Sequence, residues 1–221
     1  PYKITVMSIA EGLASIQNAI PSNVTLVAVS KTKPLEAIQE AYALGIRDFG
    51  ENRVIELVEK AKALPEDIRW HAIGHIQRNK ASLVAPISSL IHAVDSVRLY
   101  DELSKHSGEE LDVLIQIHIA DEKNKHGFYP DDFKKILDAG DDFHSSNIKI
   151  RGLMGMATFT DNNSQITNEF KALRTLFDEI SPTMGIDFDT LSMGMSGDWK
   201  IAIDEGSTLI RIGSAIFGSR N

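Results

Sequence analysis

Cysteine is absent from all 221 residues, and this single absence excludes several kinds of chemistry. Without thiols the chain forms no disulfides, holds no iron–sulfur cluster and has no Cys-ligated zinc, and no thiolate can act as a nucleophile. Hydrophobic residues make up 43% of the chain and charged residues 24%. This is the composition of an ordinary globular protein, long enough to fold around a core without covalent cross-links.

Long hydrophobic runs and an excess of positive charge are also lacking. No apolar run approaches the roughly 18 residues of a membrane-spanning helix, and the first residues, PYKITVMSIAEG, do not have the pattern of a secretion signal. Lys and Arg total 23 against 31 Asp and Glu, a net charge of −8. Proteins that bind nucleic-acid backbones have the opposite balance. We therefore expect a cytoplasmic protein that binds neither nucleic acids nor membranes.

Eight short apolar runs alternate with amphipathic segments along the chain. Several runs are nearly continuous in Val, Ile and Leu, as expected of parallel strands that are covered on both faces. The runs are residues 24–30, 46–50, 69–74, 89–94, 111–120, 148–156, 190–194 and 208–213. The segments between them space their apolar residues as helices do, with Pro34 expected as the first residue of one helix.

This alternation predicts an α/β fold, a single (β/α)8 TIM barrel with an extra N-terminal helix near residues 8–19. A doubly wound open sheet is the competing fold, but its Gly-x-Gly-x-x-Gly fingerprint is missing. No linker rich in Pro, Gly or Ser divides the chain. We therefore expect one domain over residues 1–221, with residues 1–6 either foreign to the natural protein or disordered.

Lys31 directly follows the first predicted strand. Reacting groups of TIM barrels come from the carboxyl ends of the strands and from the loops that follow them. A partly buried amine at such a position gives up its proton more readily and can form a Schiff base with a carbonyl group. The alternative is an ordinary surface lysine, like its neighbour Lys33.

The last two predicted strands both run into loops that carry glycine and a hydroxyl, residues 192–198 and 208–217. Successive backbone N–H groups in such loops can bind an anion at the start of a helix. The loops after strands seven and eight are also the usual phosphate site of this barrel. The alternative is that the glycines only allow tight turns.

Arg211 lies within the last apolar run, where a guanidinium group needs an acceptor. It could pair with a carboxylate such as Asp204 or Glu205, or it could face a ligand ring. The histidines show no metal-binding pattern: His71 and His75 are four residues apart across a strand end and not along a helix, so no metal site is expected.

Motifs from residue 24 to residue 220 resemble those of the pyridoxal phosphate homeostasis proteins. These motifs are VAVSKTKP, FGEN, WHAIGHIQRNK, HAVDS, IADEKNKHG, RGLM and LSMGMSGDWKIAIDEGSTLIRIGSAIFGSR. The resemblance implies one barrel similar to the N-terminal domain of alanine racemase. It also implies pyridoxal 5′-phosphate (PLP, from vitamin B6) as the cofactor, held as a Schiff base on Lys31.

The resemblance assigns the other cofactor contacts as well. They are Ser196, Gly213 and Ser214 at the phosphate, with Met195 adjacent, Arg211 at the pyridine nitrogen, and Asn52 and His71 beside the ring. The motif DEKNKHG places Lys125 in a polar loop from which it could reach the barrel mouth.

Two functions of different classes are compatible with these residues. The first is a PLP carrier or buffer that is not an enzyme, and the alternative is an amino-acid racemase with weak activity. Racemisation needs a second acid–base group on the opposite face of the substrate. Related racemases take that group from an additional β-domain, and this sequence ends soon after its last predicted strand. We therefore expect a monomeric carrier that binds PLP and amino acids and makes transient contact with apo-enzymes.

Overall fold

The computed structural model describes residues 8–108, 110–122, 126–140 and 142–218. Eight parallel strands pair in chain order and close into a barrel when β8 pairs with β1. The strands are β1 (Thr25–Val29), β2 (Asp48–Glu51), β3 (Arg69–Ala72), β4 (Leu90–Val94), β5 (Leu111–Gln116), β6 (Ile148–Met154), β7 (Thr190–Ser192) and β8 (Leu209–Ile212). The predicted TIM barrel is confirmed, while the expectations for residues 1–6 and for Lys125 lie outside the described residues.

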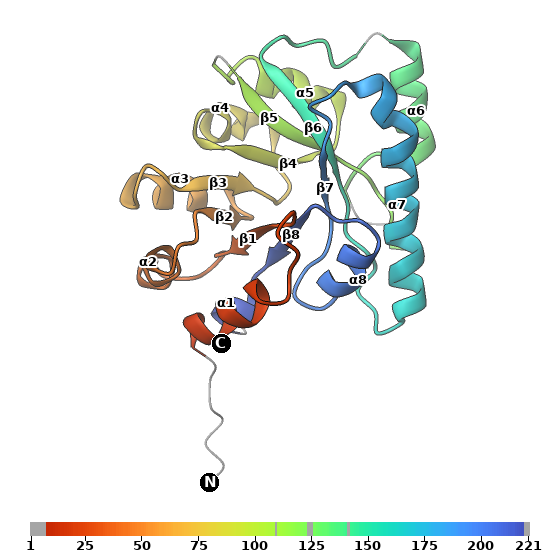
Figure 1. Ribbon diagram of the computed structural model, residues 1–221. Helices are drawn as coiled ribbons and strands as arrows, with labels where there is room; N and C mark the ends of the chain where they lie inside the picture. The colour runs from red at the N-terminus through yellow and green to blue at the C-terminus, as the bar shows by residue number, and fades with distance from the viewer. Residues whose placement is uncertain (1–7, 109, 123–125, 141, 219–221) are drawn as a thin grey trace.

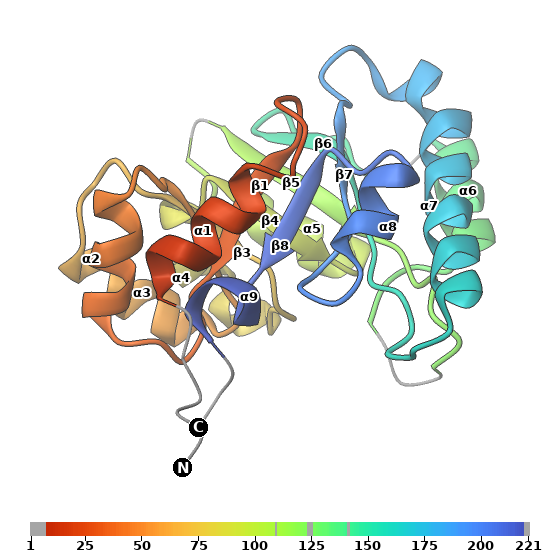
Figure 2. The same ribbon diagram turned by 60° about the horizontal axis from the view of Figure 1, so that its bottom comes forward.

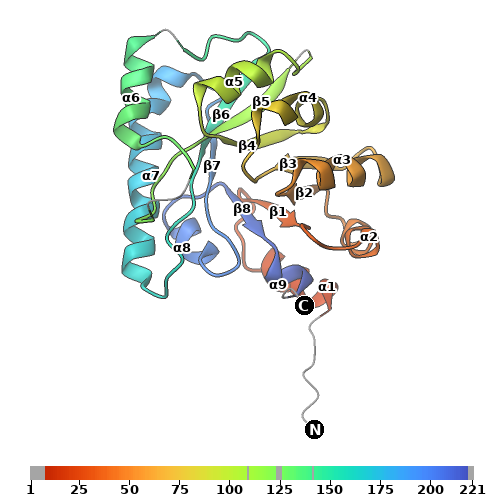
Figure 3. The ribbon, with the colours of Figure 1, turned by 180° about the vertical axis from the view of Figure 1, so that it is seen from behind.

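Helices form the outer layer of the barrel (Figures 1 and 3). They are α1 (Ile9–Gln17), α2 (Leu35–Ala43), α3 (Val54–Ala63), α4 (Ala81–Val84), α5 (Val97–Ser104), α6 (Pro130–Ala139), α7 (Asn163–Met184), α8 (Trp199–Asp204) and α9 (Ser214–Phe217). The short 3-10 helices η1 (Arg78–Lys80) and η2 (Ala85–Ile87) flank α4. Pro34 is the N-cap of α2 and not its first residue, a shift of one position that is common at helix ends. None of the described helices is both long and apolar enough to cross a bilayer.

The predicted extra N-terminal helix is α1, which packs beside α9 where the barrel closes (Figure 2). It begins with a capping box: the Ser8 hydroxyl accepts from the Glu11 N–H, and the Glu11 carboxylate accepts from the Ser8 N–H. A Cβ added at Gly12 would lie 2.6 Å from the Ala215 carbonyl oxygen. Only glycine therefore allows α1 to approach α9 this closely.

The two faces of each strand have different environments. Outward-facing residues such as Phe49, Ile91 and Ile210 are fully buried against the helices, where each large side chain contributes about 1.5–3 kcal/mol. The barrel interior holds a second and smaller apolar group that includes Val27 and Met154. The described interior also contains buried polar side chains, among them His71, His92, Ser192 and Arg211. These residues lie behind the cavity that is described next.

Candidate functional site

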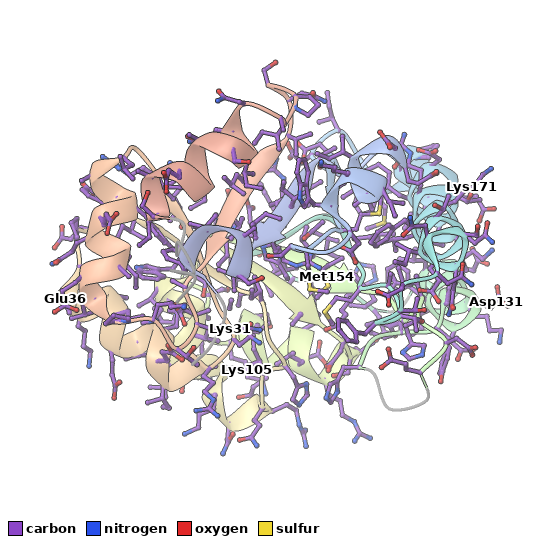
Figure 4. The ribbon with its side chains drawn as sticks, turned by 90° about the horizontal axis from the view of Figure 1, so that it is seen from below. Lys31, Glu36, Lys105, Asp131, Met154 and Lys171 are labelled. Atoms are coloured by element: carbon purple, nitrogen blue, oxygen red, sulfur yellow. The ribbon has the colours of Figure 1, made fainter. Side chains whose placement is uncertain are left out.

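A cavity of about 770 Å³ opens at the carboxyl ends of the strands. Its size is that of an ordinary cofactor or small-molecule site. Seven of the residues predicted from the sequence line it: Lys31, Asn52, Met195, Ser196, Arg211, Gly213 and Ser214. Figure 4 shows Lys31 and Met154 towards the middle of the molecule, and Glu36 and Lys171 on the outer helices.

The backbone on both sides of Lys31 is fixed by a buried ionic cluster. Lys60 Nζ donates to the Ser30 carbonyl oxygen at 2.8 Å, and to Glu51 and Glu56 at 2.7 Å each. The Ser30 hydroxyl donates to Glu51 at 2.5 Å, and the Thr32 N–H donates to Glu56 at 2.6 Å.

Thr32 has a φ of 64°, a left-handed conformation that is uncommon for a residue other than glycine. The bond to Glu56 holds this turn in place. Burial raises the pKa of Glu51, and the hydrogen bonds from Lys60 and Ser30 oppose that rise. The cluster lies between the barrel and α3, so it positions the end of β1 without entering the cavity.

Hydrogen-bond donors from the last two strand ends converge at the cavity wall. The Ser196 hydroxyl oxygen accepts from the backbone N–H of Gly213 at 3.3 Å and from that of Ala215 at 3.4 Å. A Cβ added at Gly213 would lie 3.2 Å from the Val29 carbonyl oxygen, so β8 leaves little room for a side chain there. At Gly197 an added Cβ would meet nothing within 4 Å. This wall can therefore present a hydroxyl and backbone N–H groups to an anion.

Arg211 is buried on β8 and still borders the cavity. Its Nη1 donates to Ser192 Oγ, and its Nη2 donates to the Gly155 carbonyl oxygen at 3.1 Å. Among the described residues its hydrogen bonds reach neither Asp204 nor Glu205, which were alternatives from the sequence. Burial lowers the pKa of Arg211 to about 10, so the guanidinium remains charged at neutral pH.

A chain of hydrogen bonds continues from Arg211 through the barrel interior. Ser192 Oγ lies 3.0 Å from His92 Nδ1, and His92 Nε2 lies 2.9 Å from His71 Nδ1. His71 Nε2 then lies 3.0 Å from Asp48 Oδ1. The chain thus joins a buried cation beside the cavity to a carboxylate on β2.

The two ends of this chain fix the direction of its outermost bonds. A guanidinium group can only donate, so Ser192 accepts from Arg211, and a carboxylate can only accept, so His71 donates from Nε2 to Asp48. Burial, with further electrostatic effects of His71 and Arg211, holds the pKa of His92 well below its usual value, so the ring is neutral. A neutral ring donates from one nitrogen and accepts at the other, so the two bonds of His92 run in the same direction along the chain. Neighbouring bonds in such a chain strengthen one another.

Comparisons with known proteins identify the family of this chain. The sequence profile of the alanine racemase N-terminal domain matches residues 4–221. The pyridoxal phosphate homeostasis protein of Haemophilus influenzae is 39% identical over 215 residues, which cover 93% of this chain and 89% of that protein. The human protein of the same name is 40% identical over 211 residues, covering 89% of this chain and 76% of its relative. The chain belongs to the pyridoxal phosphate homeostasis family.

Solved structures of this family have the same barrel. PipY of Synechococcus elongatus without PLP superimposes with a TM-score of 0.89 at 38% identity, covering 96% of this chain and all of that one. The PLP-bound form of PipY gives 0.85 at 37% identity, with the same coverage. Alanine racemase of Corynebacterium glutamicum shares the fold, with a TM-score of 0.76 at 16% identity, and this chain covers 60% of its length.

The residues behind the cavity were not predicted from the sequence. His71 is not a cavity-lining side chain in the described structure, because both of its ring nitrogens are engaged in the interior. Asp48 and His92 were not singled out, and Ser192 was included only as the first residue of the loop 192–198. Asp48 begins β2, His92 lies within β4 and Ser192 ends β7, so a polar residue within a predicted strand is the signal that could have identified them.

Proposed function

We propose that the cavity binds PLP covalently through Lys31, and that the protein maintains PLP pools as a carrier or buffer of the cofactor. The observation that carries this proposal is one cavity bordered by an amine, by the Ser196 hydroxyl with glycine-bearing strand ends, and by a buried guanidinium group. The names of the relatives and the PLP-bound form of PipY support the same function.

The residues present fit this cofactor. Ser196, Gly213 and Ser214 would hold the phosphate, which needs several donors close together. The N–H of Gly213 would then exchange its 3.3 Å bond to the Ser196 hydroxyl for one to the phosphate. Ser214 and Met195 line the same cavity, and Asn52, which also lines it, would lie beside the ring. His71 would not contact the cofactor directly, because it is connected to Arg211 only through His92 and Ser192. The bound cofactor supplies a reactive aldehyde and a ring that can accept electrons.

Arg211 would face the pyridine nitrogen of the ring. Its Nη1 bond to Ser192 is the start of the interior chain, and this bond fixes the orientation of the guanidinium group. A permanent donor leaves the ring nitrogen as an acceptor and disfavours its protonation. An unprotonated ring withdraws electrons less strongly, which favours a carrier over an enzyme.

The alternative is a PLP-dependent racemase-like enzyme with weak activity. One experiment separates the two functions: PLP content, PLP transfer to an apo-enzyme, and α-proton exchange of amino acids in D2O are measured on the same preparation. A carrier holds about one PLP per chain, releases it to the apo-enzyme, and exchanges α-protons no faster than Lys31→Ala. Exchange well above that variant supports the enzyme, and absence of PLP refutes both functions.

The remaining expectations stay predictions. They are binding of amino acids, transient contact with apo-enzymes, a monomeric state and a cytoplasmic location. Light scattering tests the monomer, and fractionation of cells tests the location.

A further inference from the structure

Three side chains at the rim of the cavity form a cluster that the proposed function does not use. His75 Nδ1 lies 2.8 Å from Asp95 Oδ2, and His126 Nδ1 lies 3.4 Å from the same oxygen. One donor atom from each residue lies within 4.8 Å of the other two. We propose that His75, Asp95 and His126 bind a divalent transition-metal ion of the zinc class.

The spacing of the donor atoms suits such an ion. Zn²⁺ binds imidazole nitrogen and carboxylate oxygen at about 2.0–2.2 Å, so two tetrahedral ligands lie about 3.3 Å apart. The two nitrogen–oxygen distances, 2.8 and 3.4 Å, lie close to that value. The imidazole rings are stacked, with centroids 3.8 Å apart and planes 10° apart. They must therefore tilt to aim both lone pairs at one ion. The side chains of His75 and His126 are 42% and 55% exposed, which leaves them free to do so.

The backbone brings the three residues together from consecutive strand ends. Asp95 directly follows β4, and its side chain is only 11% exposed. His75 follows β3 and is preceded by Gly74, where an added Cβ would lie 2.3 Å from the Asn52 carbonyl oxygen. Close packing against that backbone fixes the start of the loop.

His126 is held by a return of the chain to β5. The Gln116 side chain donates to the His126 carbonyl oxygen at 3.1 Å, and the Phe128 N–H donates to the Gln116 carbonyl oxygen at 2.8 Å. Gly127, between His126 and Phe128, has a φ of 123°, and a Cβ added there would lie 2.9 Å from the backbone nitrogen of His118. These contacts place His126 opposite Asp95 independently of any bond between the two side chains.

The donor set selects the kind of ion. Imidazole suits Zn²⁺, Co²⁺, Ni²⁺ and Cu²⁺, whereas Mg²⁺ and Ca²⁺ need shells of oxygen ligands. Three protein ligands leave one position of a tetrahedral ion open. His75 and His126 also line the cavity that contains Lys31, so this open position lies at the cavity mouth.

Sequence spacing compared His71 with His75 and did not point to this cluster. His71 points into the barrel, while the partners of His75 lie 20 and 51 positions further along the chain. Only closure of the barrel brings these three loops together. The inference does not depend on the cofactor, since none of the three residues is assigned to PLP.

The test is calorimetry of Zn²⁺ binding to the tag-free, PLP-loaded protein, with Mg²⁺ titrated separately. We expect one Zn²⁺ per chain with a Kd of about 1 µM or lower, and no measurable Mg²⁺ binding. His126→Ala and Asp95→Asn should each weaken Zn²⁺ binding by more than about 100-fold, because even residues that only orient a ligand are worth about 10- to 100-fold.

His106→Ala is the matched control. His106 is 37% exposed and lies 3.4 Å from Glu102, so it is another half-exposed His–carboxylate pair. This variant should bind Zn²⁺ as the wild type does. Lys31→Ala should also keep its affinity, and a loss there would place the ion on the cofactor and overturn the proposal. So would a wild type that binds no Zn²⁺, or unchanged binding in both His126→Ala and Asp95→Asn.

Discussion

Asp48 ends the interior hydrogen-bond chain, and its replacement by Asn tests whether that end carries a charge. Its carboxylate accepts from His71 at 3.0 Å and from Arg69 at 2.7 Å, and its side chain is only 15% exposed. Burial raises the pKa of Asp48, but the hydrogen bonds from His71 and Arg69 outweigh it and lower the pKa from 3.8 to about 2. Asp48→Asn keeps the shape and an acceptor oxygen for His71 while removing the charge.

The magnitude follows from this pKa difference. Between pH 3.8 and pH 2 the unfolded state binds more protons than the folded state, so stability falls as the pH falls through this interval. The ionised carboxylate therefore contributes about 2.4 kcal/mol at pH 7, at 1.36 kcal/mol per pKa unit. About half of this contribution remains at pH 3. Asp48→Asn should cost roughly 2 kcal/mol at pH 7 and roughly 1 kcal/mol at pH 3.

Urea unfolding of both proteins at pH 7, 5, 4 and 3 measures this difference. Asp67→Asn is the control, because Asp67 also pairs with an arginine but has a side chain that is 56% exposed, where ion pairs contribute little. Its effect at pH 7 should be much smaller than that of Asp48→Asn. A penalty for Asp48→Asn that is equal at pH 7 and pH 3 would refute an ionised carboxylate at the end of the chain.

Three further predictions concern the cavity and its support. Gly213→Val should weaken the binding of PLP but not of pyridoxal, because the added side chain obstructs the phosphate wall; equal losses in equilibrium titrations would indicate a general folding defect. Lys60→Met should lower the free energy of unfolding by about 3–5 kcal/mol, because Glu51 then stays buried without its cation. In denaturant melts the double variant with Glu51→Gln should recover part of this loss, and no recovery would argue against the ion pair. The nitrogen-15 shift of ring-labelled PLP should be that of an unprotonated pyridine, and a pyridinium shift would contradict the proposed role of Arg211.

The barrel could be predicted because several of its strands are nearly continuous apolar runs that alternate with amphipathic segments. In β1, Leu26 and Ala28 face the helices while Val27 belongs to the interior group, so both faces select hydrophobic residues. The cavity residues could be predicted for a related reason. Strand ends meet at one rim in any parallel barrel, so Lys31 and Gly213 had to lie on the same side.

Contacts between distant strands could not be predicted in this way. His92 contacts both His71 and Ser192, and these contacts depend on the stagger of three strands. Sequence spacing does not report that stagger. From the sequence, Lys60 would be an ordinary solvent-exposed lysine of a helix. In the structure its side chain is only 7% exposed, because the packing of α3 against the barrel brings it to Glu51. In both cases the three-dimensional register determines the contact.

The central claim is that Lys31 holds PLP, and borohydride reduction followed by peptide mapping tests it most directly. The purified protein should be yellow, and reduction should fix a pyridoxyl group on the peptide that contains Lys31. Lys31→Ala should keep its fold, because the change removes an amine from the cavity wall and no packed core. A pyridoxyl group found on Lys33 or Lys125 and not on Lys31 would contradict the account.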